Sequence, residues 1–411
     1  MGTKKVLAPR VARAIGPLPD GPCLDLFAGM CSVAGELSRS RRSVWCNDVQ
    51  GYAELVARAL VQSTETPPTG FDAAKELSDA VSENGGILRT RFLKDLRAER
   101  AALAGSYNDY TALVQAWAHV GNDAALAEEA ARERAAETRE SPYRLATIAF
   151  AHGYFGLGQS IEIDSIRYAL DVTLDAGAIS AERHRWYLVA LLQAASHVVS
   201  APGHFAQFFG VRDADTFRRV RQVRARLVWP QFVLELGRLR PYGTSAWRRG
   251  NRVFSKPADA LLQDLRGASE RPSVIYADPP YTVDQYSRYY HVLETLTRYD
   301  YPASASLGRY RPDRFTSPFS LASKVVHAFE GLASDVAEIG AVLVLSYPST
   351  GLLHRKLKEE KHEELSDLLR RHFGRIDVTP IPYRHSTMGG SPGWSHAGVE
   401  ELVYVADPDP K

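Results

Sequence analysis

The sequence predicts an α/β fold in which a Rossmann-like sheet is interrupted by a long all-helical insert. Three observations support this. Residues 1–62 follow the order strand, glycine turn, helix, strand and acid, which is how a doubly wound sheet begins. From about Thr64 to Arg226 no convincing strand pattern appears, and apolar residues recur at helical spacing. Strand-like runs separated by helical patterns then return. We therefore expect a sheet domain from residues 1–62 and 251–411 and a helical insert at 63–250.

Each expected element rests on its apolar periodicity. Short apolar or alternating runs predict strands, and runs with a period near 3.6 predict helices. The predicted strands lie at 22–28, 43–46, 252–254, 273–277, 341–346, 376–383 and 401–406. The predicted helices lie near 32–39, 51–62, 124–140, 161–174, 181–199, 291–298, 321–339 and 358–372. A loop rich in glycine and serine, 384–399, joins the last two strands.

Composition excludes several classes of protein. Hydrophobic residues make up 45% of the 411 residues and charged residues 24%, which suits a folded core. The net charge of +2 means that any basic surface for nucleic acid must be local. Cys23, Cys31 and Cys46 form no C-x-x-C pair, and the twelve histidines show no metal-ligand spacing. No apolar run reaches about 18 residues. We expect a cytoplasmic protein, associated with the nucleoid when bound to DNA, with no metal and no membrane partner.

The sharpest motif is Asp278-Pro279-Pro280-Tyr281, directly after the apolar run 274–277. An exocyclic amine can attack a methyl group only if its lone pair is turned out of conjugation with its ring. Acceptors on both N–H bonds achieve this, and the carboxylate of Asp278 and the carbonyl of Pro279 are suitable acceptors. Two prolines stiffen the loop, and Tyr281 offers a flat face for an unstacked base. The alternative is an ordinary turn after a strand.

A second motif, 25–29, follows the first strand. Asp25, Phe27 and Gly29 lie where a sheet of this kind holds a nucleotide-like cofactor, and Asp48 ends the next strand, where it suits ribose hydroxyls. The G-x-G-x-x-G pattern of nicotinamide sites is absent, because position 31 is Cys31. The alternative here is a tight turn without a ligand.

A third feature is a basic stretch, 212–252, with eleven arginines against three acids. It predicts a face that contacts phosphates, with aromatic side chains as stacking partners, and the alternative is a solvated helix face over core aromatics. The arginines that we expect to bind DNA are Arg218, Arg219, Arg221, Arg224, Arg248 and Arg249. The interleaved aromatics are Phe217, Trp229, Phe232, Tyr242 and Trp247.

Together these residues resemble adenine-N6-specific DNA methyltransferases related to DNA adenine methylase, in particular relatives found with type IIS restriction enzymes. The resemblance covers most of the chain outside roughly residues 63–140. The matching segments are 1–5 with Lys4 at the family lysine, 25–29, Asn47-Asp48, Tyr154-Phe155, 163–167 and 278–300. Their order, with the cofactor motif first and D-P-P-Y late, is also that of the family.

The resemblance implies a Rossmann-like methyltransferase domain at 1–62 and 251–411, with a target-recognition insert at 63–250. It implies transfer of a methyl group from S-adenosylmethionine to a flipped adenine in double-stranded DNA, in restriction-modification or phage defence. It raises a cognate restriction or defence nuclease as a partner to be tested. The implied catalytic residues are Asp278, Pro279, Pro280 and Tyr281. The implied cofactor residues are Lys4, Asp25, Phe27, Gly29, Asp48 and Asp278.

The sequence departs from the family pattern at three places. Cys31 replaces the second glycine of the cofactor loop, and Pro257 stands where the family has an aspartate near the cofactor adenine, with Asp259 two residues on. A family N-T-x-G reads S-A-P-G at 200–203. Two alternatives stay open: an RNA-modifying or protein-amide methyltransferase, and a DNA-binding relic of the family with weakened catalysis.

Overall fold

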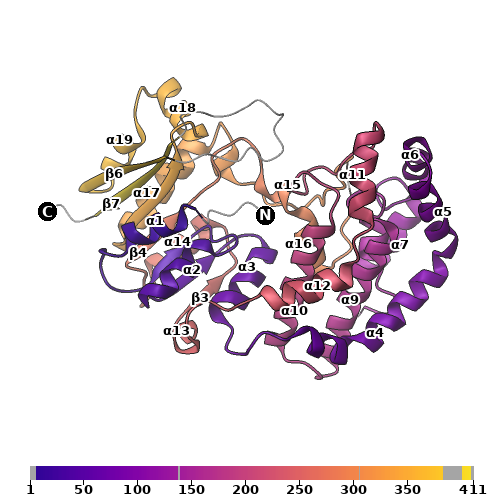
Figure 1. Ribbon diagram of the computed structural model, residues 1–411. Helices are drawn as coiled ribbons and strands as arrows, with labels where there is room; N and C mark the ends of the chain where they lie inside the picture. Colours follow the sequence, from indigo (N-terminus) through magenta and orange to yellow (C-terminus); the bar gives the residue numbers. More distant parts are fainter. Residues whose placement is uncertain (1–5, 138, 305, 383–399, 409–411) are drawn as a thin grey trace. The chain divides into compact units, whose positions relative to one another are not determined.

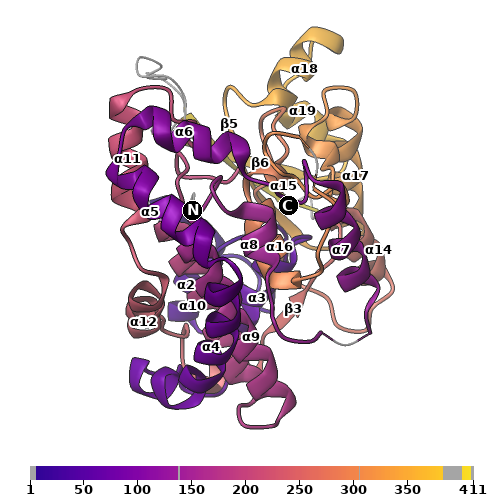
Figure 2. The ribbon, with the colours of Figure 1, turned by 90° about the vertical axis from the view of Figure 1, so that its right-hand side faces the viewer.

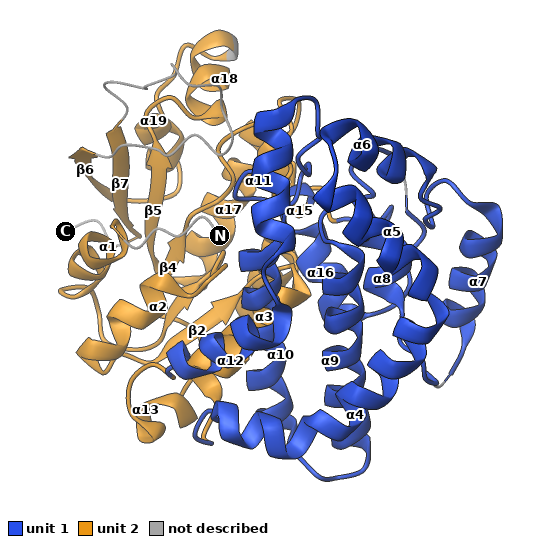
Figure 3. Cartoon of the chain, turned by 45° about the vertical axis from the view of Figure 1, so that its right-hand side comes forward, with its two compact units in different colours: residues 1, 65–240, 288–314 blue, residues 2–64, 241–287, 315–411 orange. Residues whose placement is uncertain are grey.

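The computed structural model describes residues 6–137, 139–304, 306–382 and 400–408 (Figure 1). The chain divides into two compact units (Figure 3). The sheet unit contains residues 2–64, 241–287 and 315–411, and the helical unit contains 65–240 and 288–314. Residues 241–250 therefore group with the sheet and 288–314 with the helices, although the sequence patterns had suggested the opposite for both.

All seven expected strands are present in the described part of the sheet unit. They are β1 (Cys23–Asp25), β2 (Val44–Asn47), β3 (Arg252–Phe254), β4 (Val274–Ala277), β5 (Val342–Pro348), β6 (Arg375–Pro382) and β7 (Glu400–Asp407). They form one sheet in the order β3-β2-β1-β4-β5-β7-β6. The expected loop 384–399 lies outside the described residues.

The sheet is mostly parallel. Strands β3, β2, β1, β4 and β5 pair in parallel, whereas β7 pairs antiparallel with both β5 and β6. The connections from β1 run outward through β2 and β3, and later return to β4 on the other side of β1. This reversal makes a topological switch point between β1 and β4, where sheets of this kind bind ligands. Strands β1, β2, β4 and β5 are buried along their whole length, which explains why they read as continuous apolar runs.

Helices cover the sheet, and α14 and α17 pack against each other. The helices of this unit are α1 (Ala8–Ile15), α2 (Ser32–Leu37), η1 (Ser38–Ser40), α3 (Gly51–Ala57), η2 (Arg58–Gln62), α13 (Ser245–Arg249), α14 (Ala258–Arg266), η3 (Pro318–Ser320), α17 (Val325–Ile339), α18 (Leu352–Glu360) and α19 (Leu365–Arg370). The single helix expected near 358–372 is wrong. His362 has a φ of 54°, and Glu364 and Asp367 form a capping box that starts a new helix.

The described part of the helical unit has no strand, as expected. Its helices are α4 (Gly70–Arg91), α5 (Leu93–Ala104), α6 (Tyr107–Ala116), α7 (Ala124–Ala135), α8 (Leu145–Phe150), α9 (Leu157–Asp175), α10 (Ala181–Val198), α11 (Ala214–Arg224), α12 (Val228–Arg238) and α16 (His291–Arg298). The short α15 (Tyr286–Tyr289) spans the boundary between the units. Helices α4 and α9 lie side by side (Figure 2). In the described ranges, no helix is long and apolar enough to cross a membrane.

Candidate active site

The loop after β1 is closed by Asp48, which follows β2. The Gly29 N–H donates to Asp48 Oδ2 at 3.0 Å, and the Gln50 N–H donates to Asp48 Oδ1 at 3.0 Å. Gly29 has a φ of 48°, a conformation that L side chains rarely adopt, and this explains the glycine. Asp48 therefore fixes the shape of the loop with the same carboxylate that we expected to bind ribose hydroxyls.

Cys31 takes the left-handed conformation that glycine would accept more readily. Its φ is 57° and its ψ is 32°, its N–H donates to the Ala28 carbonyl at 2.7 Å, and its side chain is buried. A non-glycine residue in this conformation costs about 1 kcal/mol. The replacement of the family glycine thus leaves the turn itself formed.

Asn47 ties together the ends of three neighbouring strands. Its Nδ2 donates to the carbonyls of Leu26 at 3.1 Å and Lys256 at 3.0 Å, and its Oδ1 accepts the Lys256 N–H at 3.1 Å. Asn47 is buried, so these bonds are shielded from water. The side chain holds the loops after β1 and β3 in place, a task that the sequence pattern did not reveal.

The acceptor loop, 278–281, leaves β4 beside the cofactor loop. Asp25 pairs with Tyr276 across β1 and β4, so Asp278 follows β4 at the level where Phe27 follows β1. Pro279 and Pro280 are buried and Asp278 is half-buried. The stiffness expected of the two prolines is thus reinforced by packing.

Tyr281 is also anchored. Its carbonyl accepts the Leu352 N–H at 2.8 Å, and its half-buried side chain packs against the core of the sheet unit. Below the loop, burial and the negative charges of Asp278 and Asp25 raise the pKa of Tyr276 well above its usual value. Tyr276 thus stays a neutral phenol under the acceptor loop.

The segment after the acceptor loop is hydrogen-bonded to the chain at 315–320. Gln285 Nε2 donates to the Ser317 carbonyl at 3.2 Å, and the Ser317 N–H donates to Gln285 Oε1 at 2.7 Å. Ser287 Oγ donates to the Phe315 carbonyl at 2.7 Å, and Ser320 Oγ donates to the Asp284 carbonyl at 3.1 Å. The acceptor loop and the segment 315–320 therefore form one connected piece.

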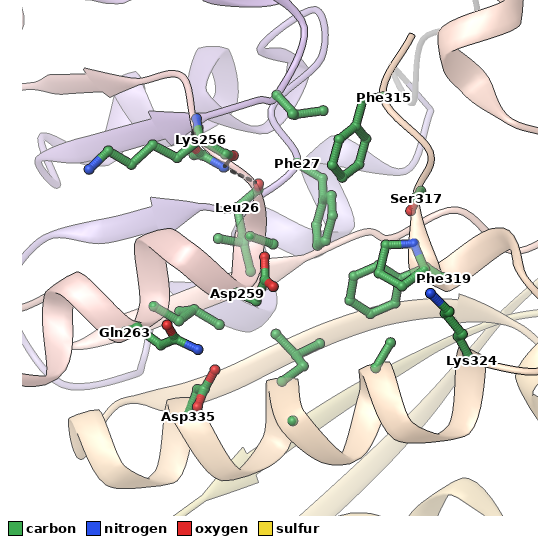
Figure 4. A pocket seen from close by; sticks show the side chains of 18 of the residues that line it. Leu26, Phe27, Lys256, Asp259, Gln263, Phe315, Ser317, Phe319, Lys324 and Asp335 are labelled. Carbon is green, nitrogen blue, oxygen red and sulfur yellow. Dashed lines mark hydrogen bonds between the residues drawn. The ribbon is translucent and has the colours of Figure 1, made fainter. Parts of the chain in front are cut away.

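That segment is a wall of a cavity of about 320 Å³ in the sheet unit. The volume falls in the range of small-molecule sites. Figure 4 shows the rings of Phe27, Phe315 and Phe319 at one side of the cavity, with Asp259 and Asp335 among the polar groups on the other. Phe27 and Phe319 meet edge to face with their centroids 5.4 Å apart.

The lining fits a cofactor with a flat base and hydroxyl groups. The aromatic wall suits a purine ring, and the carboxylates of Asp48 and Asp259 accept hydrogen bonds from hydroxyl or amine donors. Asp259 lines the cavity whereas Pro257 does not. An acidic side chain, that of Asp259, is therefore present in the cavity two residues after Pro257, which replaces the aspartate of the family pattern.

The predicted cofactor residues divide into three groups. Phe27 and Asp48 line the cavity. Asp25, Gly29 and Asp278 do not line it; Gly29 shapes its edge through Asp48. Lys4 lies outside the described residues. The wall contributed by 315–335 was missed, because no local pattern shows that a segment so distant in sequence packs against the ends of β1 and β2.

Among the predicted DNA-binding arginines, Arg218, Arg219 and Arg221 on α11 and Arg249 on α13 are exposed. Arg218 pairs with Asp215 at 2.7 Å, an exposed pair that contributes little to stability. These side chains are available for an anionic ligand.

Two of the predicted arginines are engaged within the protein. Arg224 donates to the carbonyls of Gly153 at 2.8 Å and Tyr154 at 3.0 Å and to the Tyr110 hydroxyl at 3.2 Å. Arg248 is 6% exposed, and its guanidinium donates to three backbone carbonyls, those of Ser63, Tyr242 and Gly243. Both guanidinium groups cross-link the protein and are not free for phosphate.

The aromatic stacking partners are also partly corrected. Phe217 and Phe232 are buried. Phe217 packs on Tyr110 with a centroid distance of 5.8 Å, and Phe232 packs on Trp229 at 5.5 Å. Trp247 is half-buried, and its Nε1 donates to the Arg42 carbonyl at 2.6 Å. The apolar aromatics of the basic stretch therefore serve mainly the protein core.

Comparison with known proteins gives relatives that are named as methylases or methyltransferases. No family model matches the chain. It is 28% identical over 382 residues to modification methylase LlaI of Lactococcus lactis subsp. lactis, covering 92% of this chain and 50% of that protein. It is 20% identical over 390 residues to modification methylase StsI of Streptococcus sanguinis, covering 93% and 48%. It is 26% identical over 234 residues to the type II methyltransferase M.FokI of Planomicrobium okeanokoites, covering 56% and 31%.

The chain thus spans about half the length of the first two relatives, and less of the third. Two of these relatives are named modification methylases and the third a type II methyltransferase. Over more than nine tenths of its sequence, this chain is similar to two modification methylases.

Proposed function

We propose that this chain is a site-specific DNA methyltransferase that transfers the methyl group of S-adenosylmethionine to the N6 amine of an adenine. The observation that carries the proposal is that hydrogen bonds connect the segment after the acceptor loop to the wall of the cavity. Asp278 leaves β4 at the level of Phe27, which lines the cavity, and Gln285 and Ser287 hydrogen-bond to the cavity wall. The relatives, all methylases or methyltransferases by name, support this reading.

The residues of the chain would orient the amine and hold its surroundings. The Asp278 carboxylate accepts one N–H of the amine and the Pro279 carbonyl accepts the other, so the nitrogen lone pair is turned toward the methyl donor. Phe27, Asp48 and Asp259 would hold S-adenosylmethionine, which would supply an electrophilic methyl group and leave as the neutral thioether S-adenosylhomocysteine. No strong base is needed, since the amine loses its proton after it has become cationic.

Tyr281 would support the base from one side. Its side chain packs against the core of the sheet unit and is half-buried. Stacking of an adenine on a tyrosine ring is worth roughly 1–3 kcal/mol. An adenine must leave the duplex stack to reach any loop of this kind, so we assign Tyr281 to the flipped base.

The helical unit is proposed as the target-recognition region. Its α11 carries Arg218, Arg219 and Arg221, all exposed, and α13 of the sheet unit adds Arg249. Exposed guanidinium groups on one helix suit the phosphates of a DNA backbone. In view of the relatives, the proposed setting is restriction-modification or phage defence, with a cognate nuclease as the implied partner.

The experiment is base-resolved detection of methylation with Asp278→Ala as the key variant. DNA from cells that express the chain is sequenced for modified bases, and purified protein is then tested on that site in single-turnover reactions. We expect N6-methyladenine, and a rate about 100–1000-fold lower for Asp278→Ala, because one preorganised acceptor is lost. Asp264→Ala removes an exposed acid of α14 that only pairs with Lys256, and serves as the matched control.

Three outcomes would count against the proposal. Methylated cytosine as the only product would refute adenine specificity. Methylation of RNA of the same sequence but not of DNA would move the substrate to RNA. A near-normal rate for Asp278→Ala, with folding intact, would remove Asp278 from catalysis.

A further inference from the structure

We propose that Tyr347 is a positioning residue, which fixes the acceptor loop through the start of α18 and so holds the Tyr281 ring where the flipped adenine stacks. The inference rests on the proposed function and adds to it a residue that acts on the substrate only through Tyr281. All of the residues involved belong to the sheet unit. Tyr347 is a fully buried residue of β5, the strand next to β4 in the sheet.

The start of α18 has no capping side chain, because the residue before the helix is Gly351. The first N–H groups of an α-helix have no partner within the helix and need acceptors from elsewhere. In α18 the Leu352 N–H donates to the Tyr281 carbonyl at 2.8 Å, and the Leu353 N–H donates to the Tyr347 hydroxyl at 3.0 Å. The acceptor loop and Tyr347 thus provide the acceptors that a cap would otherwise supply.

These two hydrogen bonds are shielded from water. Leu352 is 2% exposed and Leu353 is fully buried. A buried N–H that loses its acceptor is costly, because water cannot take the place of the lost partner. The helix start therefore stays in register with both Tyr347 and Tyr281, and a shift of one affects the other.

Gly351 is explained by the Tyr347 ring and not by its own backbone. Its φ of −63° and ψ of 158° are extended values that any residue adopts. A Cβ at this position would lie 2.2 Å from Cε1 of Tyr347. The ring has little room to move aside, because it packs edge to face on Phe329 with a centroid distance of 5.2 Å. The Tyr347 ring and hydroxyl together therefore determine where α18 begins.

The position of Tyr281 depends on this helix start. Its carbonyl is held by the Leu352 N–H, and its side chain packs against the core of the sheet unit. Without the Tyr347 hydroxyl, the Leu353 N–H would lose its acceptor and the first turn of α18 would shift. The Tyr281 carbonyl would follow the Leu352 N–H, and small displacements of a group that orients the substrate lower the rate strongly.

The test is a double-mutant cycle between Tyr347→Phe and Tyr281→Ala, measured in single-turnover methylation of DNA. Tyr347→Phe keeps the ring and removes only the hydroxyl. In the parent background we expect it to lower the rate about fivefold, the equivalent of one hydrogen bond. It should also reduce the brightening of a fluorescent adenine analogue at the target position. In the Tyr281→Ala background the same change should alter the rate by less than about twofold.

Three further measurements separate positioning from a general defect. The affinity for S-adenosylmethionine should stay at the parent value in Tyr347→Phe, because Tyr347 does not line the cavity. Tyr404→Phe removes the hydroxyl of a buried tyrosine of β7, and this matched control should keep the parent rate. Gly351→Ala displaces the helix start but keeps the hydroxyl, and it should lower the rate about tenfold or more. It takes the place of Tyr347→Phe in the cycle if that variant does not fold.

A parent-like rate of Tyr347→Phe or of Tyr281→Ala would overturn the positioning role. A fivefold loss that persists in the Tyr281→Ala background would also overturn it, since the hydroxyl would then act on the fold and not through Tyr281. If the parent methylates adenine, all of these results leave the proposed function standing. If the parent methylates no adenine in any duplex, the proposed function fails and the positioning role fails with it.

Discussion

Arg221 and Arg224 lie three residues apart on α11, and the structure assigns them opposite roles. Arg221 is exposed, and among the described residues no side-chain hydrogen bond or ion pair is formed by its guanidinium group. Arg224 is half-buried and donates to the carbonyls of Gly153 and Tyr154 and to the Tyr110 hydroxyl. Replacing each with alanine should therefore change different properties of the protein.

The magnitudes follow from these contacts. Arg224→Ala removes four hydrogen bonds from a charged donor, including one to Gln159 Oε1 at 3.4 Å. The Gly153 carbonyl loses this partner, whereas the Tyr154 carbonyl keeps the Ser200 N–H at 2.8 Å. At about 1 kcal/mol for each bond, we expect a loss of roughly 2–4 kcal/mol in the free energy of unfolding. Arg221→Ala removes an exposed side chain and should alter stability by less than about 0.5 kcal/mol. If Arg221 contacts a phosphate, its loss should flatten the slope of log affinity against log salt by about 0.9.

Two measurements separate the roles. Urea unfolding gives the stability of the parent and both variants, and the anisotropy of a labelled duplex at several salt concentrations gives the slope. Arg224→Ala should be less stable and keep the parent slope under conditions where it is folded. The reasoning would be refuted if Arg224→Ala were as stable as the parent but lost one unit of slope, or if Arg221→Ala kept the full slope.

Two further predictions concern the cavity and the buried histidine. Asp259→Ala should weaken binding of S-adenosylmethionine about fivefold by calorimetry, the equivalent of one hydrogen bond, whereas unchanged affinity would remove Asp259 from the site. Burial lowers the pKa of His291 to about 3, with its Nε2 beside the Phe205 carbonyl at 2.9 Å. The unfolded chain binds this proton below about pH 6.5 and the folded chain does not, so stability falls as the pH falls. When the pH is lowered from 7.5 to 5.5, the free energy of unfolding should fall by about 1.4 kcal/mol less in His291→Asn than in the parent. Equal decreases in both proteins would contradict the lowered pKa of His291.

The local pattern of apolar residues was sufficient to predict the strands of the sheet. The runs that became β1, β4 and β5 are continuous and apolar because both faces of these strands are buried. The acceptor motif could be placed at the end of β4 for the same reason. The single helix expected over 358–372 failed because a left-handed residue at His362 interrupts it, and a capping box at Glu364 restarts it.

The arginines show a signal that was present but not used. Phe217, Val220 and Arg224 are spaced by three and four residues, which places them on one face of a helix. Phe217 and Val220 are buried, so Arg224 shares the buried face. For Arg248 no such pattern exists, because one of its partners, the Ser63 carbonyl, lies 185 positions away in sequence.

By itself, the sequence determined the strand order along the chain, the helical insert and the positions of the two motifs, because these depend on periodicity and on neighbouring residues. Tertiary structure alone decided which side chains close the cavity and which arginines remain free. The segment 315–320 reaches the site through hydrogen bonds to Gln285 and Ser287. Segment 288–314 joins the helical unit although it follows the acceptor loop. Such contacts join residues distant in sequence, and their free energy depends on burial that no local pattern encodes.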